Sequence, residues 1–469
     1  MPVSISLDIL SPAGSFLRIP AAPVRALVLA VGMAADPVHA ALVEHVLSNG
    51  MKVIVKEDAR APVVVSVVWY RAGSMDESTG TTGVAHVLEH MMFKGTRSRG
   101  PGEFSRTVAR AGGRDNAFTN RDYTAYYQQL HRSKLSLALE LEADRMKNLQ
   151  LSEEEFAKEI RVVMEERRLR TDDQPRSLLY ERLLAAAWQA HPYRTPVIGW
   201  MNDLENMRVD DARDWYQRWY APNNATLVVV GDVSAQEVVD AAERHFGPIP
   251  ARALPVRKPA LEPPQNGTRR VNLKGRAELP YLLMAWHVPG LEDVDANRDA
   301  YALWMLSAVL DAGAAARLAR ELVRGSRVAV SAGASYDAIN RGPALFVLNA
   351  IPSPGRTVEE MEAALRGQLR RIADQGVDED ELARVRAGVV ASQVYQLDSM
   401  FSQAMQIGAL DNAGLPPGSV QTQVRRLQQV TAADVQAVVR RYFVDDNLTV
   451  AVLDPQREPG GRASAGEDE

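Results

Sequence analysis

A pattern near residue 220 returns near the end of the chain. The stretch WYAPNNATLVVVGD at 219–232 aligns without gaps on RYFVDDNLTVAVLD at 441–454, and a helical pattern precedes each copy. A strand pattern that ends near Trp69 has a counterpart that ends near Trp286. Such self-similarity is typical of a duplicated unit. The chain is therefore expected to fold as two tandem α+β halves of similar design.

A second alignment lays GVAHVLEHMMFKGT (83–96) over GAAARLARELVRGS (313–326), with two pairs of glycines in register. It places Ala316, Ala319 and Arg320 where the first copy has two histidines and a glutamate. The second half is therefore expected to lack the chemistry that those three residues carry out in the first.

The length and one proline-rich stretch set the domain boundaries. A chain of 469 residues is too long for one ordinary core. Residues 247–267, GPIPARALPVRKPALEPPQNG, have almost no periodic apolar pattern and predict a linker. The expected organisation is an N-terminal half at 41–246, a linker at 247–267, a C-terminal half at 268–455 and a disordered polar tail at 456–469.

The amino-acid composition limits which kinds of catalytic and metal site the chain can form. The chain has no cysteine, which excludes disulfides, thiolate catalysis and cysteine-bound zinc, so any metal must be held by His, Asp or Glu. A net charge of -5 gives no electrostatic reason to expect nucleic acid or an anionic membrane surface as partner.

The N-terminus has the order of a secretory signal. Arg18 and Arg25 precede the apolar run ALVLAVGMAA, and DPVHA then ends in a small residue at Ala40. The apolar run is too short to span a bilayer comfortably. We expect residues 1–40 to be a cleavable signal peptide and the mature protein to be periplasmic. The alternative is a disordered tail that leads into a core strand.

Two of the eight histidines lie four residues apart with a glutamate between them. His86, Glu89 and His90 read H-x-x-E-H within TTGVAHVLEHMMFKGT (81–96). On a helix, residues four apart share a face, so both imidazoles can point at one zinc ion at about 2.0–2.1 Å. Glu89 would lie beside a water at the open position and could act as general base. The alternative is a solvated polar face, but the apolar neighbours would bury these groups at a cost that a metal relieves.

A zinc site of this kind needs a third protein ligand. The remaining histidines are isolated along the chain, whereas EEEFAKEIRVVMEERRLR at 153–170 places several glutamates on one helix. Glu159 and Glu166 are seven apart and share a face, while Glu165 is turned by about 100° from Glu166. Periodicity alone does not choose between Glu165 and Glu166.

Several ordered motifs resemble one family. GVAHVLEHMMFKGT, GGRDNAFTNRDYTAYY and EIRVVMEERR, followed by HPYRTPVIG and WYAPNNATLVVVGD, resemble the pitrilysin/insulinase family of zinc peptidases, which are inverzincins. By size, the nearest branch holds the mitochondrial processing peptidases and their bacterial relatives. The resemblance covers about residues 43–454. It implies two tandem halves, each a mostly antiparallel sheet packed with helices, and two such pairs that enclose a peptide-sized chamber.

The resemblance also assigns roles at the predicted metal site. It implies one zinc ion per chain, with His86 and His90 as ligands and Glu89 as general base. The third ligand in such proteins lies seven positions after another functional glutamate, which favours Glu166 as ligand. Glu159 would then be the carboxylate that orients a ligand.

A further motif concerns the substrate. GGRDNAFT, with Asn116 and Ala117, resembles the edge strand that pairs with substrate backbone in this family. Pairing of this kind relies on main-chain hydrogen bonds, so it tolerates many substrate sequences.

One departure from the family pattern lies in the second half. Members that work alone, and the partner chain of two-chain members, carry an arginine and, seven residues later, a tyrosine. Here LVRGSRVAV puts Val323 and Val330 at those positions, and neither can donate a hydrogen bond to the substrate carbonyl or to the oxyanion. Loss of one such donor costs on the order of 10²- to 10³-fold in rate. Arg324, Arg327 and Tyr336 lie nearby but out of register.

The resemblance and its departure together imply a zinc endopeptidase subunit that hydrolyses oligopeptides in a closed chamber. A homologous sibling chain without the zinc motif would supply the Arg/Tyr pair in a heterodimer. Two alternatives stay open: a self-sufficient homodimeric zinc peptidase with another oxyanion donor, and a non-catalytic scaffold subunit of the same fold.

Overall fold

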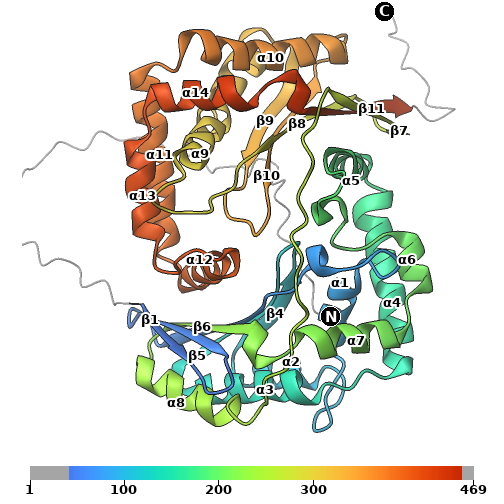
Figure 1. The fold of residues 1–469 in the computed structure, drawn as a ribbon, viewed down its shortest axis with the longest axis vertical. Coiled ribbons are helices and arrows are strands. Elements are labelled where there is room, and N and C mark those ends of the chain that lie inside the picture. Colours follow the sequence, from blue (N-terminus) through green and yellow to red (C-terminus); the bar gives the residue numbers. More distant parts are fainter. Residues whose placement is uncertain (1–41, 457–469) are drawn as a thin grey trace, which may run out of the picture.

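The computed structural model describes residues 42–456 (Figure 1). The predicted signal peptide at 1–40 and residues 457–469 of the predicted tail lie outside the described residues. None of the helices between residues 42 and 456 has an apolar stretch long enough to span a bilayer.

The first half is built on a six-stranded sheet in the order β1-β2-β6-β3-β5-β4. Its strands are β1 (Val43–Val46), β2 (Lys52–Glu57), β3 (Val63–Tyr70), β4 (Arg114–Thr119), β5 (Thr124–His131) and β6 (Ala225–Gly231). β2 and β6 run parallel, and the other pairs are antiparallel. β3 and β6 are apolar and buried along nearly their whole length, as expected for central strands covered on both faces.

Most helices of the first half lie on one face of this sheet (Figure 1). They are α1 (Val84–Met91), α2 (Glu103–Arg110), α3 (Leu135–Asn148), α4 (Glu153–Arg167), α5 (Pro175–Ala187), α6 (Met201–Asn206), α7 (Val209–Trp219) and α8 (Ala235–His245). Short 3₁₀ turns include η1 (Ser74–Asp76) and η4 (Pro192–Arg194), and α4 continues into the π-helical η3 (Arg168–Asp172). Apolar side chains of α1, α3, α7 and α8 share one core with the sheet.

The second half repeats this plan around a five-stranded sheet in the order β7-β11-β8-β10-β9. Its strands are β7 (Arg269–Arg276), β8 (Tyr281–Val288), β9 (Ala329–Tyr336), β10 (Ala344–Pro352) and β11 (Leu448–Gln456). Its helices are α9 (Arg298–Asp311), the π-helical η6 (Leu318–Gly325), α10 (Val358–Gln375), α11 (Glu379–Gln396), α12 (Met400–Ala413), α13 (Val420–Gln429) and α14 (Ala432–Tyr442). Only β7 and β11 pair in parallel within this sheet.

The two sheets match strand for strand. β2, β6, β3, β5 and β4 correspond in order to β7, β11, β8, β10 and β9, and the parallel pair occupies the same place in each. This confirms the predicted class of two tandem α+β halves with mostly antiparallel sheets. The alignment of 219–232 with 441–454 agrees with it, because it lays β6 on β11.

The alignment of 83–96 with 313–326 is wrong. By element order, the counterpart of α1, which follows β3, is α9, which follows β8. Ala319 and Arg320 lie on η6, which takes the place of α2, and Ala316 lies two residues before it. The coincidence of two glycine pairs suggested the wrong register. The sequence of α9, RDAYALWMLSAVLD, contains no histidine, so the second half still lacks the H-x-x-E-H motif.

The proline-rich segment 247–267, all of which the structure describes, forms neither helix nor strand. Figure 1 shows it in yellow-green, extended between α8 and β7. Its Glu262 carboxylate accepts hydrogen bonds from the backbone N–H groups of Gln189, Ala190 and His191 at 2.7–2.9 Å. The segment is therefore fastened to the first half along its path.

One helix of each half packs against the sheet of the other half. α5 of the first half places Leu179 and Leu183 in an apolar cluster with β8 and β11. α12 of the second half places Ala404 and Ile407 in a cluster with β3 and β6. Figure 1 shows α12 over the first sheet and α5 beside the second. Two apolar interfaces thus join the halves.

The approach of α12 to the first sheet depends on Gly408, where a Cβ would overlap the indole of Trp69. We expect Gly408→Ala to lower the free energy of unfolding by about 1–3 kcal/mol, because overpacking outweighs the better helix propensity of alanine. Gly388→Ala is the matched control: it lies in α11 with nothing within 4 Å, and alanine there should stabilise by about 1 kcal/mol. Denaturant midpoints of the two variants should shift in opposite directions, and shifts of the same sign would contradict this packing.

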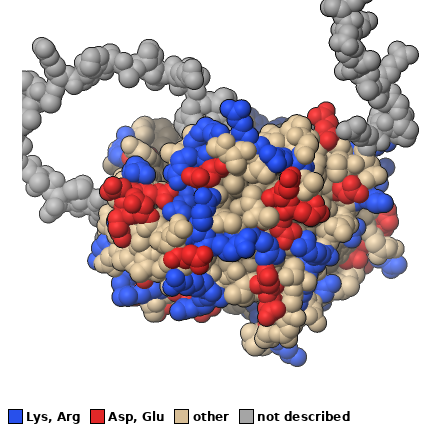
Figure 2. Space-filling model, turned by 90° about the horizontal axis from the view of Figure 1, so that it is seen from above, with Lys and Arg blue, Asp and Glu red and all other residues tan. Residues whose placement is uncertain are grey.

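Charged side chains of both signs occur together on the surface. On the face shown in Figure 2, acidic groups border the basic ones. In the second half, ion pairs such as Arg366–Glu362 and Arg441–Asp299 join groups of opposite sign.

Candidate metal centre

Helix α1 is held at its start by a carboxylate. Glu77 accepts hydrogen bonds from the backbone N–H groups of Gly83 at 2.8 Å and Ala85 at 2.9 Å. These N–H groups have no partner within the helix, so a carboxylate there caps the helix and favours its dipole. Val87 and Leu88 are fully buried in the first core, which fixes the rotation of the helix. The motif side chains therefore project in one defined direction.

His86, His90 and Glu166 converge at that place. One possible ligand atom from each lies within 4.8 Å of the others, and no other group of His, Asp or Glu in residues 42–456 meets this condition. His90 Nε2 lies 3.4 Å from Glu166 Oε2, and His86 Nε2 lies 4.0 Å from Glu166 Oε1. Ligand atoms around a tetrahedral zinc ion lie roughly 3.4 Å apart, given bond lengths of about 2.0–2.1 Å. The spacing is close to that of a zinc site.

The polar atoms of these histidines support the same assignment. His86 is 4% exposed, and the Nε2 of His90, which faces Glu166 at 3.4 Å, is buried and makes no well-formed hydrogen bond. A buried polar atom without a partner costs about 1–3 kcal/mol. Two imidazoles and one carboxylate, with room for a fourth ligand, are a donor set that fits catalytic zinc. The residues present therefore fit the metal.

Glu159 and Lys94 form a second layer around His90. Glu159 Oε2 lies 3.3 Å from His90 Nδ1, and its Oε1 lies 2.5 Å from Lys94 Nζ. A carboxylate at Nδ1 favours the tautomer that carries the proton there and leaves Nε2 available to a metal. Glu159 thus contacts the ring nitrogen of His90 opposite the one that faces Glu166.

The structure distinguishes the two adjacent glutamates. Glu166 faces the histidines and also pairs with Arg170 of η3 at 2.5 Å. Glu165 turns outward, with a side chain that is 57% exposed and paired with Arg168. Glu166 is therefore the glutamate that the fold brings to the histidines.

Glu89 is buried beside the histidines, with 2% of its surface exposed. The hydroxyl of Thr119, the last residue of β4, donates to Glu89 Oε2 at 2.6 Å. Sequence reasoning assigned no role to Thr119, although it shares a strand face with Ala117 two residues earlier. That alternation was the signal that could have found it.

Burial and neighbouring charges separate the pKa values of the site. Burial, together with the nearby His90, lowers the pKa of His86 to about 3. Burial raises the pKa of the Glu89 carboxyl to about 7. Burial alone would lower the pKa of His90, but the facing carboxylates of Glu159 and Glu166 outweigh it and raise that pKa to about 9. His90 and the two carboxylates therefore hold a proton tightly at neutral pH.

Metal binding should displace that proton. A histidine must be unprotonated to bind zinc, and the pKa of His90 is about 9, so zinc and a proton compete below that pH. We expect the apparent zinc affinity to rise about tenfold per pH unit from about pH 7 to pH 9 and then to level off. Glu159→Gln lowers the pKa of His90 and should flatten this rise. Chelator competition across pH measures it, and an affinity independent of pH would contradict it.

Asn116 and Ala117 lie on β4, the terminal strand of the first sheet among the described residues. Ala117 turns its methyl group into the core next to α1 and is 1% exposed. Its backbone N–H donates to the side-chain oxygen of Asn116 at 2.9 Å. The strand next to the metal centre is thus an edge strand.

Val323 and Val330 lie in the second half, on η6 and β9. Val323 packs against the second core, and Val330 is 48% exposed. Tyr336 donates its hydroxyl to the backbone oxygen of Pro289 at 2.7 Å. Tyr336 is therefore engaged inside the second half.

Comparison with known proteins decides the family. Residues 52–199 match the family model of insulinase (peptidase family M16), and residues 206–389 match that of the peptidase M16 inactive domain. The zinc protease PqqE of Helicobacter pylori is 31% identical over 418 residues, covering 87% of this chain and 92% of the relative. The chain belongs to peptidase family M16. This confirms the resemblance that the motifs carry.

Further M16 relatives agree in length and shape. An uncharacterized zinc protease of Mycobacterium leprae is 30% identical, over 87% of this chain and 91% of its own. The crystal structure of a protease from Helicobacter pylori matches with a TM-score of 0.84 and 29% identity, over 89% of this chain and all of that one. The periplasmic protease PqqL of Escherichia coli shows the same fold at 19% identity and a TM-score of 0.76. This chain spans 48% of PqqL.

Proposed function

We propose that this M16 chain is the zinc-binding subunit of an endopeptidase that hydrolyses oligopeptides, with one zinc ion held by His86, His90 and Glu166. The observation that carries the proposal is the convergence of these three side chains next to a buried Glu89 whose carboxylate is held by a hydroxyl. A scaffold would have no need of a general base in that position.

The chain's own residues supply proton transfer and orientation. When bound, zinc is a Lewis acid that polarises a peptide carbonyl and makes water easier to deprotonate. Glu89 accepts a proton from the attacking water and passes it to the leaving amine. Burial makes this carboxyl a stronger proton acceptor than an exposed one, as a general base requires. Thr119 fixes one oxygen of that carboxylate, and Glu159 fixes the ring of His90.

The edge strand β4 offers a way to hold the substrate. An extended peptide that pairs with β4 gains main-chain hydrogen bonds, and it would run past the residues that lead to Thr119 and Glu89. The backbone of Ala117 and the side chain of Asn116 lie on this edge. Binding through main-chain groups fits a peptidase of broad sequence tolerance.

A sibling chain would complete the site. Val323 and Val330 provide no hydrogen-bond donor for the oxyanion. The likeness to PqqL supports pairing. The first half of PqqL alone matches 87% of this chain at a TM-score of 0.74, so the PqqL chain carries a second half in addition to the part that resembles this protein. In our proposal a homologous chain without the zinc motif supplies the Arg/Tyr pair and closes the chamber.

A pull-down from native extract tests this proposal, with zinc content and peptide hydrolysis measured before and after. We expect the isolated chain to hold about one zinc ion. Its rate of peptide hydrolysis should be lower than that of the mixed complex by on the order of 10²-fold or more. Full activity of the isolated chain, with no gain from any partner, would contradict the need for a sibling. A chain that binds no zinc would contradict the whole proposal.

A self-sufficient homodimer is the second candidate. Arg324 and Arg327 are exposed next to the two valines, and Arg327 has a φ of 53°, a conformation that is rare outside glycine. If the isolated chain is active as a dimer, loss of that activity in Arg327→Ala would favour this candidate.

A further inference from the structure

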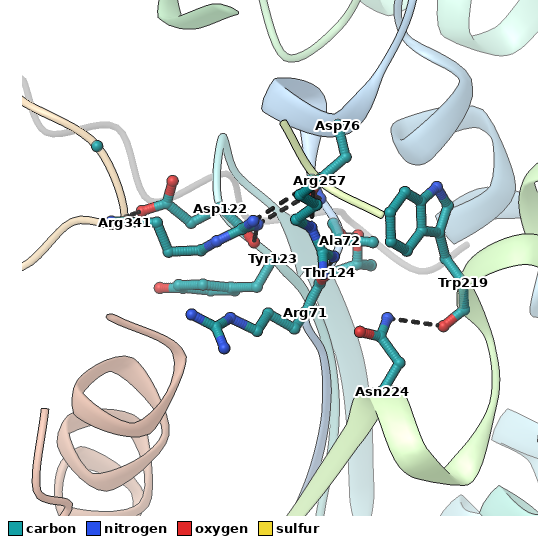
Figure 3. A network of polar contacts seen from close by, with 12 residues as sticks. Arg71, Ala72, Asp76, Asp122, Tyr123, Thr124, Trp219, Asn224, Arg257 and Arg341 are labelled. Carbon is teal, nitrogen blue, oxygen red and sulfur yellow. Dashed lines mark hydrogen bonds and ion pairs between the residues drawn. The ribbon is translucent and has the colours of Figure 1, made fainter. Parts of the chain in front are cut away.

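A loop of the second half contacts two segments of the first half that adjoin α1 and β4. Arg341 lies between β9 and β10, Asp76 belongs to η1, and Asp122 lies in the turn between β4 and β5. Figure 3 shows the arginine pointing at both acidic residues. Its Nη1 donates to Asp76 Oδ2 at 2.9 Å and to the backbone oxygen of Asp122 at 2.8 Å, and its backbone N–H donates to Asp122 Oδ2 at 3.0 Å.

This junction is buried and closely fitted. The side chains of Arg341 and Asp76 are 6% and 4% exposed. The hydroxyl of Tyr193 donates to Asp122 Oδ1 at 2.5 Å and accepts from the N–H of Gly342 at 2.9 Å. A Cβ on Gly342 would lie 2.6 Å from the ring of His191, so the loop is seated against the first half. Arg257 of the linker also pairs with Asp76 at 2.6 Å, so what Arg341 alone provides is the link between Asp76 and the backbone oxygen of Asp122.

Both segments that Arg341 holds lead directly to the site. Glu77, the residue after Asp76, caps the start of α1. The turn that contains Asp122 follows β4, whose last residue, Thr119, holds Glu89. The two segments are also bonded to each other, because the N–H groups of Ser74 and Met75 donate to backbone oxygens of the turn at 3.1 and 2.9 Å.

We infer that Arg341 is a positioning residue for the metal centre, which it orients from the second half through Asp76 and Asp122. The start of the zinc-binding helix and the strand that holds the general base are fastened to one guanidinium of the other half. The docking of the second half therefore sets the geometry of the site, although His86, Glu89, His90 and Glu166 all belong to the first half. The effect on hydrolysis rests on the proposed function, whereas the effect on α1 does not.

The test compares Arg341→Lys with a matched control. Lysine keeps the charge but cannot reproduce the planar set of donors that reaches Asp76 and Asp122 together. Arg269→Lys is the control, since Arg269 also belongs to the second half and donates to the backbone oxygens of Ala186 and Ala187 in α5, away from α1. Tyr193→Phe removes the hydroxyl between Asp122 and Gly342 and is a milder second variant.

Amide hydrogen exchange of the full zinc-loaded chain is the first measurement. We expect Arg341→Lys, and to a lesser degree Tyr193→Phe, to raise exchange several-fold in peptides that cover 73–92 and 117–124. Arg269→Lys should leave those peptides unchanged. The inference would be overturned if both Arg341→Lys and Tyr193→Phe exchanged at the wild-type rate in peptides 73–92 and 117–124. It would also be overturned if Arg269→Lys raised exchange there as much as Arg341→Lys does.

Steady-state kinetics of the active complex is the second measurement. A misplacement of about 1 Å can cost on the order of 10²-fold in rate, so kcat of Arg341→Lys should fall about 10- to 100-fold while KM stays within about threefold. A rise in KM at unchanged kcat would overturn the inference. If the wild-type complex hydrolyses no peptide, the proposed function fails, and the exchange result still decides the role of Arg341.

Discussion

Replacing Glu89 with glutamine is expected to lower peptide hydrolysis by about 10²- to 10⁴-fold while zinc stays bound. The amide keeps the size of the carboxyl and can still meet the hydroxyl of Thr119, but it cannot accept the proton of water. Zinc content and kcat of the same preparation give the measurement. Glu154→Gln, on the exposed side of α4, should change neither quantity.

The outcome of Glu89→Gln also separates an enzyme from a scaffold. Hydrolysis at the wild-type rate would remove Glu89 from the chemistry. Loss of zinc together with activity would show instead that the buried carboxyl supports the metal site itself. Only retained zinc with lost turnover agrees with a general base.

Replacing Glu166 with glutamine is expected to weaken zinc binding by more than 100-fold. A neutral amide is a poor zinc ligand, and the charge that balances the ion is lost as well. Glu159→Gln should weaken binding by about 10- to 100-fold, the range typical of a residue that only orients a ligand. Glu165→Gln should have no effect, because that side chain turns outward.

Chelator competition at about pH 9, where protons compete little for His90, ranks these three variants. The expected order of zinc affinity is Glu165→Gln equal to wild type, then Glu159→Gln, then Glu166→Gln. If Glu165→Gln lost the metal and Glu166→Gln kept it, the assignment of the third ligand would be wrong.

The sequence predicted well which side chains lie together at the candidate metal centre where the signal was local. His86, Glu89 and His90 lie within two turns of one helix, so their spacing alone defines a shared face. The glutamate that faces the two histidines was harder to predict, because Glu165 and Glu166 differ only by the rotation of α4 against α1. That rotation is set by packing between helices, and the family resemblance supplied the choice that periodicity did not.

Internal symmetry was predicted where strands carry it and missed where helices do. The β6 and β11 patterns are dense in buried apolar residues, so their alignment was reliable. The helix that follows β8 was misplaced because matching glycines outweighed the order of elements. Thr119 had only the alternation of its strand as a signal, and Arg341 had none, since it meets Asp76 across 265 residues of chain. Contacts of that kind follow from how the two halves dock.

The exchange of α5 and α12 between the halves has a practical consequence. Each half expressed as a separate fragment would leave an apolar sheet face bare, so neither fragment is a suitable unit for isolated study. A backbone cut between residues 251 and 266 would interrupt no helix or strand, and it would leave α5 and α12 packed on the opposite sheets. Two co-expressed fragments divided there should reassemble by complementation. The packing of α5 and α12 on the opposite sheets, rather than an unbroken chain, would then hold the two halves together.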